Sequence, residues 1–304
     1  PSLKNGSAGS GLIKMKPAFD VIVCGSLHLD IVVNAKALPI IDETAIGSAW
    51  HQVCGGKGGN QAVQAARAGA KTAMIGCIGE DAFGKTLHAN LISQSVDVSC
   101  LSVDPSVGSG MSVAILQDNG DYGAVIVSGS NSSIDTNLLQ GQWTKLGGGK
   151  VLILQNEVPE EVNFAIAKAA REAGAKVVIN AAPARELSQE LLNLIDVLIV
   201  NRVEAEAMSG RTVTNRAEAR AALDKLISTS RSVIITLGGE GLVVADASGK
   251  IVEIESIPVR VTSTHGAGDC FVGTLCAQLA SGVLLIDACR LANQTAAAFV
   301  SRAH

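Results

Sequence analysis

The sequence predicts an α/β fold: a mostly parallel β-sheet covered by helices on both faces, with a small lid of further β-strands. From Phe19 onward, short apolar runs alternate with amphipathic stretches, which is typical of a parallel sheet with helical crossovers. Asp30–Val53 and Gly110–Val127 instead hold short alternating runs and turns with no helix between them, which indicates antiparallel strands. The length of 304 residues suits one large domain with such an elaboration.

The elements follow in a regular order. Phe19–Gly25 is an apolar run that ends in a glycine-serine turn, so we expect a buried strand there. Asn60–Ala70 carries alanines on one face and predicts a helix that Asn60 opens and Gly69 ends. The other expected strands are Lys71–Ile78, Lys150–Leu154, Lys176–Ile179, Val197–Val200 and Ser232–Thr236. The other expected helices are Ala82–Ser95, Glu160–Ala173, Ala217–Ser228, Gly268–Leu279 and Leu285–Ser301.

We expect residues 15–304 to form a single α/β domain with lid strands at about 30–53 and 110–127. Residues 1–14 are rich in Gly and Ser and precede Met15, so we interpret them as the remnant of an expression tag. A strand-built lid beside an α/β core predicts a ligand held between the two, where closure excludes water.

Composition excludes several classes of function. The net charge is −4 and no Lys/Arg cluster is present, so nucleic acid is not an expected partner. No run of about 18 uncharged apolar residues exists, which argues against a membrane span. The seven cysteines form no C-x-x-C pair and no zinc spacing, so we expect free thiols in a cytoplasmic protein.

Gly79–Thr86 matches the phosphate-binding pattern G-x-x-x-x-G-K-[ST] between a strand and a helix. A phosphate loop wraps backbone N–H groups around its ligand, so the carboxylates of Glu80 and Asp81 are costly there. Phe83 is also bulky for such a loop. We therefore interpret Asp81 as a helix N-cap.

Two glycine-rich turns are better candidates for a site. In Gly55–Asn60, four glycines in five positions allow a close approach to a ligand, and Lys57 supplies a positive charge; a flexible surface turn is the alternative. In Thr264–Phe271, small residues open an apolar helix whose free N–H groups and positive end create an anion hole. Asp269 in its first turn is placed to act as a base, although a capping role is the alternative.

Single polar residues follow several of the expected strands, at the edge where open α/β sheets bind ligands. Each residue alone is also explained as a cap or a turn. They are Asp30, Glu157, Asn201, Glu204 and the Thr236–Gly241 segment. Among the five histidines, only His28 and His265 lie near these positions, and none has metal-ligand spacing.

With these motifs, the chain resembles the ribokinase-like (PfkB) carbohydrate kinases over its whole length from about Phe19. The resemblance lies in Gly25-Ser26 with Asp30, the Gly55–Asn60 loop with Gln61-Ala62-Val63, Gly79–Gly84, Gln155–Glu157, Asn180–Arg185, Asn201–Glu204, Thr236–Gly241 and Gly266–Asp269. The Gly-Gly-Lys-Gly-x-Asn-Gln-Ala loop is most similar to that of the ribokinases.

The resemblance implies a three-layer α/β/α core and an ATP-dependent kinase that phosphorylates a hydroxyl of ribose or a related pentose. It implies that Asp269 is the catalytic base and that the amides of Gly266, Ala267 and Gly268 stabilise the transferring phosphoryl group. The implied sugar ligands are Asp30, His28, Gly56, Lys57, Asn60 and Glu157. The implied nucleotide ligands are Asn201, Thr236, Gly238, Gly241, His265 and Asn293, with Glu204 holding Mg²⁺ through water. The lid would also form a homodimer contact.

Three departures from the family pattern limit these expectations. His28 stands where ribokinases usually have Asn, which leaves ribose itself open. Ser263-Thr264-His265 replaces the Asp-Thr-Thr of members activated by a monovalent cation, so a K⁺ site is expected to be weak. The sequence stops at His304, before the usual C-terminal Gly-Ala segment and last helix.

Two other functions stay open. One is a nucleoside kinase of the same fold, which the low aromatic content of 3% disfavours because bases commonly stack on aromatic rings. The other is a non-catalytic sugar-binding protein, which the pairing of Asp269 with an anion hole disfavours.

Overall fold

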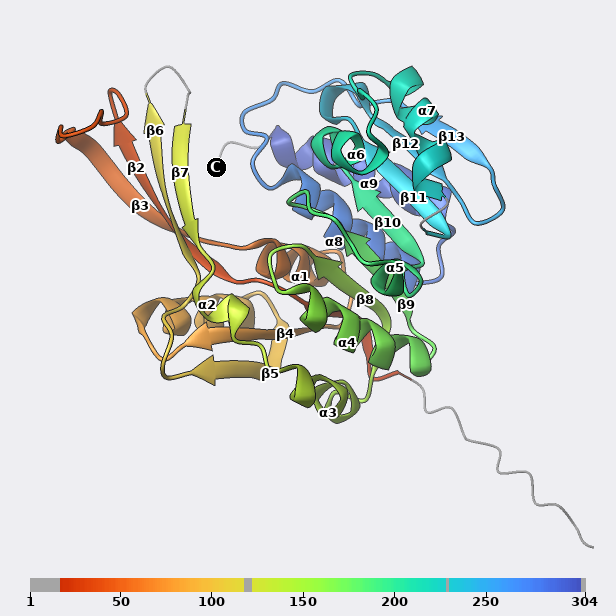
Figure 1. Cartoon of the computed structure of the whole chain (residues 1–304), viewed down its shortest axis with the longest axis horizontal. Helices are drawn as coiled ribbons and strands as arrows, with labels where there is room; N and C mark the ends of the chain where they lie inside the picture. Colours follow the sequence, from red (N-terminus) through yellow and green to blue (C-terminus); the bar gives the residue numbers. More distant parts are fainter. Residues whose placement is uncertain (1–16, 118–121, 228–229, 302–304) are drawn as a thin grey trace, which may run out of the picture.

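The computed structural model describes residues 17–117, 122–227 and 230–301, and within them it forms a three-layer α/β/α core with a second, smaller sheet (Figure 1). The fold class predicted from the sequence is confirmed. The expectation for residues 1–14 lies outside the described residues.

The central sheet has the strand order β13-β12-β11-β10-β9-β8-β1-β4-β5. The strands from β5 to β11 pair in parallel, whereas β12 and β13 continue the sheet antiparallel (Figure 1). The strands are β1 Phe19–Cys24, β4 Thr72–Gly79, β5 Val96–Asp104, β8 Gly149–Gln155, β9 Lys176–Asn180, β10 Val197–Val200, β11 Ser232–Thr236, β12 Leu242–Ala245 and β13 Ile251–Ile254.

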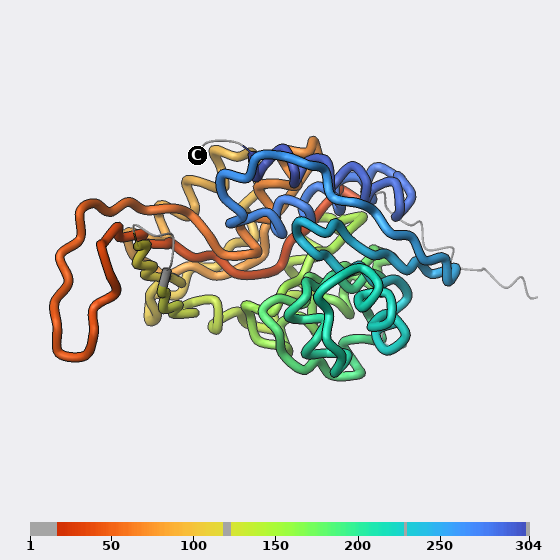
Figure 2. Tube along the Cα trace, turned by 90° about the horizontal axis from the view of Figure 1, so that it is seen from above, coloured from red at the N-terminus to blue at the C-terminus, as the bar shows by residue number. Residues whose placement is uncertain are grey.

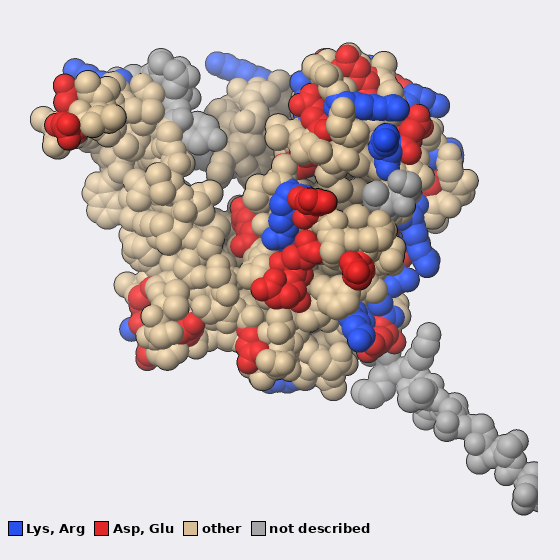
Figure 3. Space-filling view, in the orientation of Figure 1, with Lys and Arg blue, Asp and Glu red and all other residues tan. Residues whose placement is uncertain are grey.

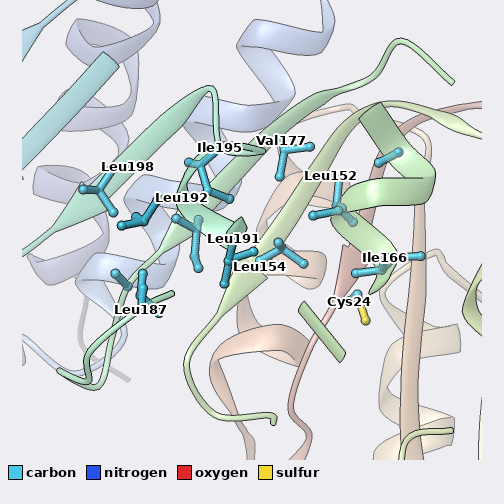
Figure 4. Close-up of a cluster of buried hydrophobic side chains, with 14 of the residues drawn as sticks. Cys24, Leu152, Leu154, Ile166, Val177, Leu187, Leu191, Leu192, Ile195 and Leu198 are labelled. Atoms are coloured by element: carbon cyan, nitrogen blue, oxygen red, sulfur yellow. The ribbon is translucent and has the colours of Figure 1, made fainter. Parts of the chain in front are cut away.

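Helices cover both faces of this sheet, and each face has its own apolar core. One core contains side chains of α3, α4, α5, α6 and α7 and strand residues such as Leu152 and Leu154 (Figure 4). The other core contains side chains of α1, α2, α8 and α9, with Val151 and Ile153 from the same strand. The alternation of neighbouring residues between two cores explains why the parallel strands read as unbroken apolar runs. The α-helices are α1 Lys57–Arg67, α2 Ala82–Ser93, α3 Leu139–Lys145, α4 Glu160–Glu172, α5 Gln189–Leu192, α6 Arg202–Ser209, α7 Arg216–Leu226, α8 Ala267–Ala280 and α9 Leu285–Val300.

The second sheet has the order β3-β2-β6-β7 and projects from the core at one end (Figures 1 and 2). Its strands are β2 His28–Ala35, β3 Gly47–Gly55, β6 Met111–Gln117 and β7 Tyr122–Val127. Large apolar side chains are exposed on it, with Trp50 66% and Val125 69% accessible. In Figure 3 the body of this sheet is almost free of charged side chains, which are confined to its tip.

Some elements differ from the sequence prediction. Helix α1 begins at Lys57, after Gly56 in a positive-φ conformation, and not at Asn60 as expected. Strand β5 and the antiparallel pair β12 and β13 were not predicted, nor were the short helices α3, α5 and α6. No helix within the described ranges is long and apolar enough to cross a membrane.

Candidate active site

The parallel strands bring several polar residues to one edge of the sheet, among them the predicted ligands Asn201 and Thr236. Gln155, Asn180 and Thr236 end β8, β9 and β11, and Asn201 follows β10. Strand β1 lies between β8 and β4, so the chain reverses its direction of winding beside Gly25, where α/β sheets commonly bind ligands. A cleft of about 100 Å³ opens along the same edge, at the ends of β9, β10 and β11 and the start of α8. Its walls are Lys57, Asn180, Ala182, Ile199, Asn201, Thr236, Gly266, Gly268, Asp269, Phe271 and Val272.

Asp269 stands in the first turn of α8, which begins at Ala267 after Gly266 in a left-handed conformation with φ 78°. Its side chain is 8% exposed. The side-chain amide of Asn60 donates to its Oδ2 at 3.1 Å, and that of Gln61 donates to its Oδ1 at 2.8 Å. Both carboxylate oxygens are therefore held by donors on α1.

Burial raises the pKa of the Asp269 carboxyl, because removal from water disfavours the charged form. The positive charge of Lys57 opposes this increase, as do the hydrogen bonds from Gln61 and Asn60. The pKa stays above its ordinary value. A carboxylate with a raised pKa, beside a helix N-terminus, has the character of a general base.

The predicted anion hole is only partly free. The Ala267 amide donates to the Thr264 carbonyl at 3.2 Å, which closes the turn before α8. Gly266 and Gly268 line the cleft. Amides in the first turn of a helix lack intrahelical acceptors, so Gly268 and Asp269 supply the N–H groups best placed for an anion.

The glycine-rich segment at the start of α1 packs tightly against the backbone that follows β1. A Cβ at Gly58 would lie 2.6 Å from the backbone nitrogen of Ser26, and a Cβ at Gly56 would lie 2.8 Å from that of His28. These glycines let α1 pack directly on the backbone that follows β1. The amide of Lys57 donates to Glu157 Oε2 at 2.8 Å, so it is already used within the protein.

Glu157 and Asp30 extend the site toward the smaller sheet. The hydroxyl of Ser26 donates to Glu157 Oε2 at 2.5 Å, and His28 Nδ1 lies 4.0 Å from the same oxygen. Asp30, on β2, accepts a hydrogen bond from the hydroxyl of Ser112 on β6 at 2.5 Å. Two carboxylates and an imidazole thus lie where the projecting sheet joins the core.

Asn201 and Glu204 form a capping box at the start of α6. The Asn201 side chain accepts from the amides of Val203 and Glu204, and Glu204 Oε2 accepts from the Asn201 amide at 2.9 Å. Burial raises the pKa of Glu204, which is 5% exposed, and nearby Lys57 opposes that shift. The capping explanation therefore holds for both residues, and it leaves one carboxylate oxygen of Glu204 available to a ligand.

Of the other predicted nucleotide ligands, Thr236 lines the same cleft, whereas Gly238, Gly241, His265 and Asn293 do not. Gly241, with φ 88°, passes so close to the Ile254 carbonyl that any side chain would collide with it, which explains the glycine structurally. Gly238 lies in the same turn, and His265 is exposed beside α8. Asn293, on α9, donates to the Glu255 carbonyl at 2.9 Å. It lines a separate hollow of about 290 Å³ with residues 253–255, Ile257, Arg290 and Gln294.

Gly79–Thr86 is a capped turn and not a phosphate loop. Asp81 is the N-cap of α2 and accepts from the Gly84 amide at 2.7 Å. The same carboxylate accepts from the amide and hydroxyl of Ser109 at 2.7 and 2.8 Å. A carboxylate thus occupies the place that a phosphate would need, as the sequence predicts.

The comparisons with known proteins agree with this geometry. A family model described as "pfkB family carbohydrate kinase" matches residues 18–304. The chain belongs to the pfkB family of carbohydrate kinases. Together with the relatives below, this membership makes it an ATP-dependent carbohydrate kinase.

Relatives of this pfkB-family kinase match along almost all of their length. The ribokinase of Haemophilus influenzae is 34% identical over 284 residues, or 92% of both chains, and that of Lactococcus lactis is 33% identical over 274 residues, or 90% of this chain and 87% of the relative. The structure of Arabidopsis thaliana ribokinase complexed with ribose and ATP superposes with a TM-score of 0.84 at 27% identity, over 93% of each chain.

The sequence analysis of this pfkB-family kinase missed three site residues. Gln61 contacts Asp269 directly, Asn180 accepts a hydrogen bond from Gln61 at 3.1 Å, and Gln155 donates to Gln61 at 2.8 Å. All three lie inside motifs quoted above. A glutamine on the alanine-rich packing face of a predicted helix was the available signal, because a buried amide needs polar partners.

Proposed function

We propose that this carbohydrate kinase transfers the γ-phosphoryl group of Mg-ATP to a hydroxyl of ribose or a related pentose, with Asp269 as the general base. The observation that carries the proposal is the buried carboxylate of Asp269, held by amides through both oxygens beside a helix N-terminus. The printed activities of the relatives support the pentose, since ribokinases match over nearly the whole chain.

Asp269 takes the proton from the attacking sugar hydroxyl. As it does so, the oxygen of that hydroxyl bonds to the γ-phosphorus, and the bond between the γ-phosphorus and the oxygen that bridges to the β-phosphate breaks. The free amides at the start of α8, with Gly266, Ala267 and Gly268 shaping the turn, face the charge that develops on the phosphoryl oxygens. Lys57 lies close enough to influence the Asp269 carboxyl and supplies a positive charge to the same cleft.

The sugar is held where the projecting sheet meets the core. Asp30 and Glu157 accept hydrogen bonds from its hydroxyls, and Asn60 and Lys57 donate to it. His28 lies 4.0 Å from Glu157, and Gly56 keeps the backbone close enough for the pocket to stay small. The four-stranded sheet acts as a lid over this sugar and as the contact of a homodimer, for which its exposed apolar surface is suited.

ATP lies along the edge of β10 and β11. Asn201, Thr236 and His265 are near its phosphates, while Gly238, Gly241 and Asn293 border its nucleoside half. Magnesium fits this donor set, because Mg²⁺ keeps several waters and needs only one or two carboxylates besides substrate phosphates. Glu204 would hold it through water, and the ion neutralises charge on the phosphates. We propose a cytoplasmic enzyme, consistent with its seven free cysteines.

A monovalent cation contributes little to this enzyme in our proposal. Ser263 occupies the position from which relatives supply a carboxylate, and its hydroxyl accepts instead from the His265 amide at 3.3 Å. Without that negative charge, a K⁺ ion near the turn is weakly held.

The proposal is tested by ADP release with a panel of pentoses, hexoses and nucleosides. We expect turnover with ribose or a related pentose. Transfer to nucleosides but not to free sugars would make the protein a nucleoside kinase, and binding of a sugar without any ADP release would make it a non-catalytic binding protein. Asp269→Ala should lower kcat by about 10²–10⁴, the usual contribution of a general base. Lys85→Ala, in the capped turn, should change kcat no more than a few-fold, and the reverse ranking would refute the site.

A further inference from the structure

Asp269 is the end of a chain of buried side-chain amides. Gln61 donates to Asp269 Oδ1 at 2.8 Å and to Asn180 Oδ1 at 3.1 Å, so both hydrogens of its amide nitrogen are used. Behind it, Gln155 Nε2 donates to Gln61 Oε1 at 2.8 Å. Gln61 and Gln155 are both fully buried, at 0% exposure.

The orientation of these amides is fixed by the carboxylate. An ionised carboxylate only accepts hydrogen bonds, so Gln61 must turn its nitrogen toward Asp269 and its oxygen away. That oxygen then needs a donor, which the amide nitrogen of Gln155 supplies. Without Gln155, the Gln61 oxygen would be buried and unpaired, which would weaken the orientation that the carboxylate requires.

Gln155 orients Gln61 while leaving one of its own polar atoms without a partner in the part of the chain that the structure describes. Its own Oε1 is buried and has no hydrogen-bond partner among the described residues. The atom lies against Gly25, where a Cβ would come within 1.9 Å of it. A glutamine that served packing alone would not need an unpaired buried oxygen beside a glycine.

We propose that Gln61, oriented by Gln155, is a positioning residue that keeps Asp269 ionised and aimed at the substrate hydroxyl. The inference rests on the proposed role of Asp269 and adds the device that makes a buried carboxylate usable as a base. Burial raises the pKa of Asp269, and the nearby Glu157 carboxylate adds to that rise. The charge of Lys57 and the hydrogen bonds from Gln61 and Asn60 counteract it. The amide chain therefore contributes to the pH below which the base is lost.

The experiment compares Gln61→Met and Gln155→Met with a matched control, Gln64→Met. Gln64 is on the same helix and also donates to α8, to the hydroxyl of Thr274 at 2.9 Å, but it does not contact Asp269. Methionine keeps the length of glutamine and removes its donor. The pH dependence of kcat/KM is measured for each variant. The titration of ATP is the same in every assay, so it cancels from the comparison. The unfolding temperature of each variant shows whether it is folded.

We expect Gln61→Met to lower kcat by about ten- to a hundredfold, the loss of one hydrogen bond to a charged group. Its acidic limb should move upward by about one pH unit, since the carboxyl then protonates more easily. Gln155→Met should move the limb in the same direction by less, and Gln64→Met should leave it in place.

Several results would overturn the inference. An unmoved acidic limb in Gln61→Met, despite a lower kcat, would show that Gln61 only fills space, and an equal shift in Gln64→Met would make the effect unspecific. If Gln61→Met does not fold, Gln155→Met provides the test, because Gln155 does not touch Asp269. An unmoved acidic limb of the pH profile in Gln155→Met would then be enough to overturn the inference. Full activity of Asp269→Ala would instead refute the proposed function, whereas an inactive Asp269→Ala beside an unaltered Gln61→Met would refute only the amide chain.

Discussion

Asp81→Ala separates the two interpretations of the Gly79–Thr86 turn, because it should cost stability and not catalysis. The carboxylate accepts from the Gly84 amide and from the amide and hydroxyl of Ser109. Loss of an N-cap costs about 1 kcal/mol. The two hydrogen bonds to Ser109 add about 1 kcal/mol each. This value is at the low end for a charged acceptor, because the carboxylate is partly exposed and water screens it. We expect the free energy of unfolding to fall by about 2–3 kcal/mol.

The same residue predicts a dependence on pH. Burial opposes ionisation of Asp81, but the hydrogen bonds from Ser109, Gly84 and Phe83 together outweigh it and hold its pKa below the ordinary 3.8. A lowered pKa in the folded state means that the stabilisation is complete above 3.8 and is lost as the pH falls through the lowered value. The stability difference between the wild type and Asp81→Ala should therefore shrink in acid.

Urea unfolding followed by circular dichroism measures this difference at neutral and acidic pH. Glu80→Ala is the matched control, because Glu80 is the exposed neighbour and its loss should change stability by less than about 0.5 kcal/mol. The KM for ATP of folded Asp81→Ala should stay within a few-fold of the wild type. A large rise in that KM with little loss of stability would show that the turn binds phosphate after all.

Three further predictions concern the site. Ser112→Ala should raise the KM for the sugar by about tenfold with kcat nearly unchanged, because Asp30 loses the hydroxyl that orients it; an unchanged KM in initial-rate assays would remove Asp30 from the sugar site. Gly266→Ala should lower the free energy of unfolding, measured with urea, by about 1–2 kcal/mol, because Gly266 has a left-handed φ of 78°. It should also lower kcat by tilting the amides of α8, and a wild-type kcat would contradict the role of these amides. Replacing Na⁺ by K⁺ should change the rate by less than a few-fold, and strong activation by K⁺ would show that Ser263 does not impair a cation site.

The sequence predicts most of the fold because the signals are local. Apolar runs such as Val197–Val200 are too hydrophobic for the surface and are separated from one another by helical stretches. Val197–Val200 is a fully buried strand in the structure. Strand β5, by contrast, lies at the edge of the sheet with only Val96 and Cys100 buried, so it lacks the unbroken apolar run on which the assignment relied. The position of helix α1 was misjudged for a related reason: Gly58 and Gly59 are poor helix formers, yet tertiary packing places them in its first turn.

The site is less predictable, because proximity in the chain does not show which atoms share a hydrogen bond. Asp269 could be proposed as the base, since the sequence shows a carboxylate in the first turn of a helix after small residues. Its hydrogen bond with Gln61, 208 positions earlier, could not be read from spacing alone. Capping and ligand binding also use the same residue types, so the capping box of Asn201 and Glu204 does not by itself distinguish the two interpretations.

The first turns of α1 and α8 together explain why such different motifs lie in one site. The glycines that begin α1 bring it against the backbone after β1, and this contact places Asn60 and Gln61 opposite the start of α8. A bulkier residue at Gly58 would push α1 away from Ser26 and withdraw both amides from Asp269. The carboxylate would then be buried without these donors, and its pKa would rise further. In the proposed mechanism, the glycine-rich turn therefore supports the base through the packing of α1.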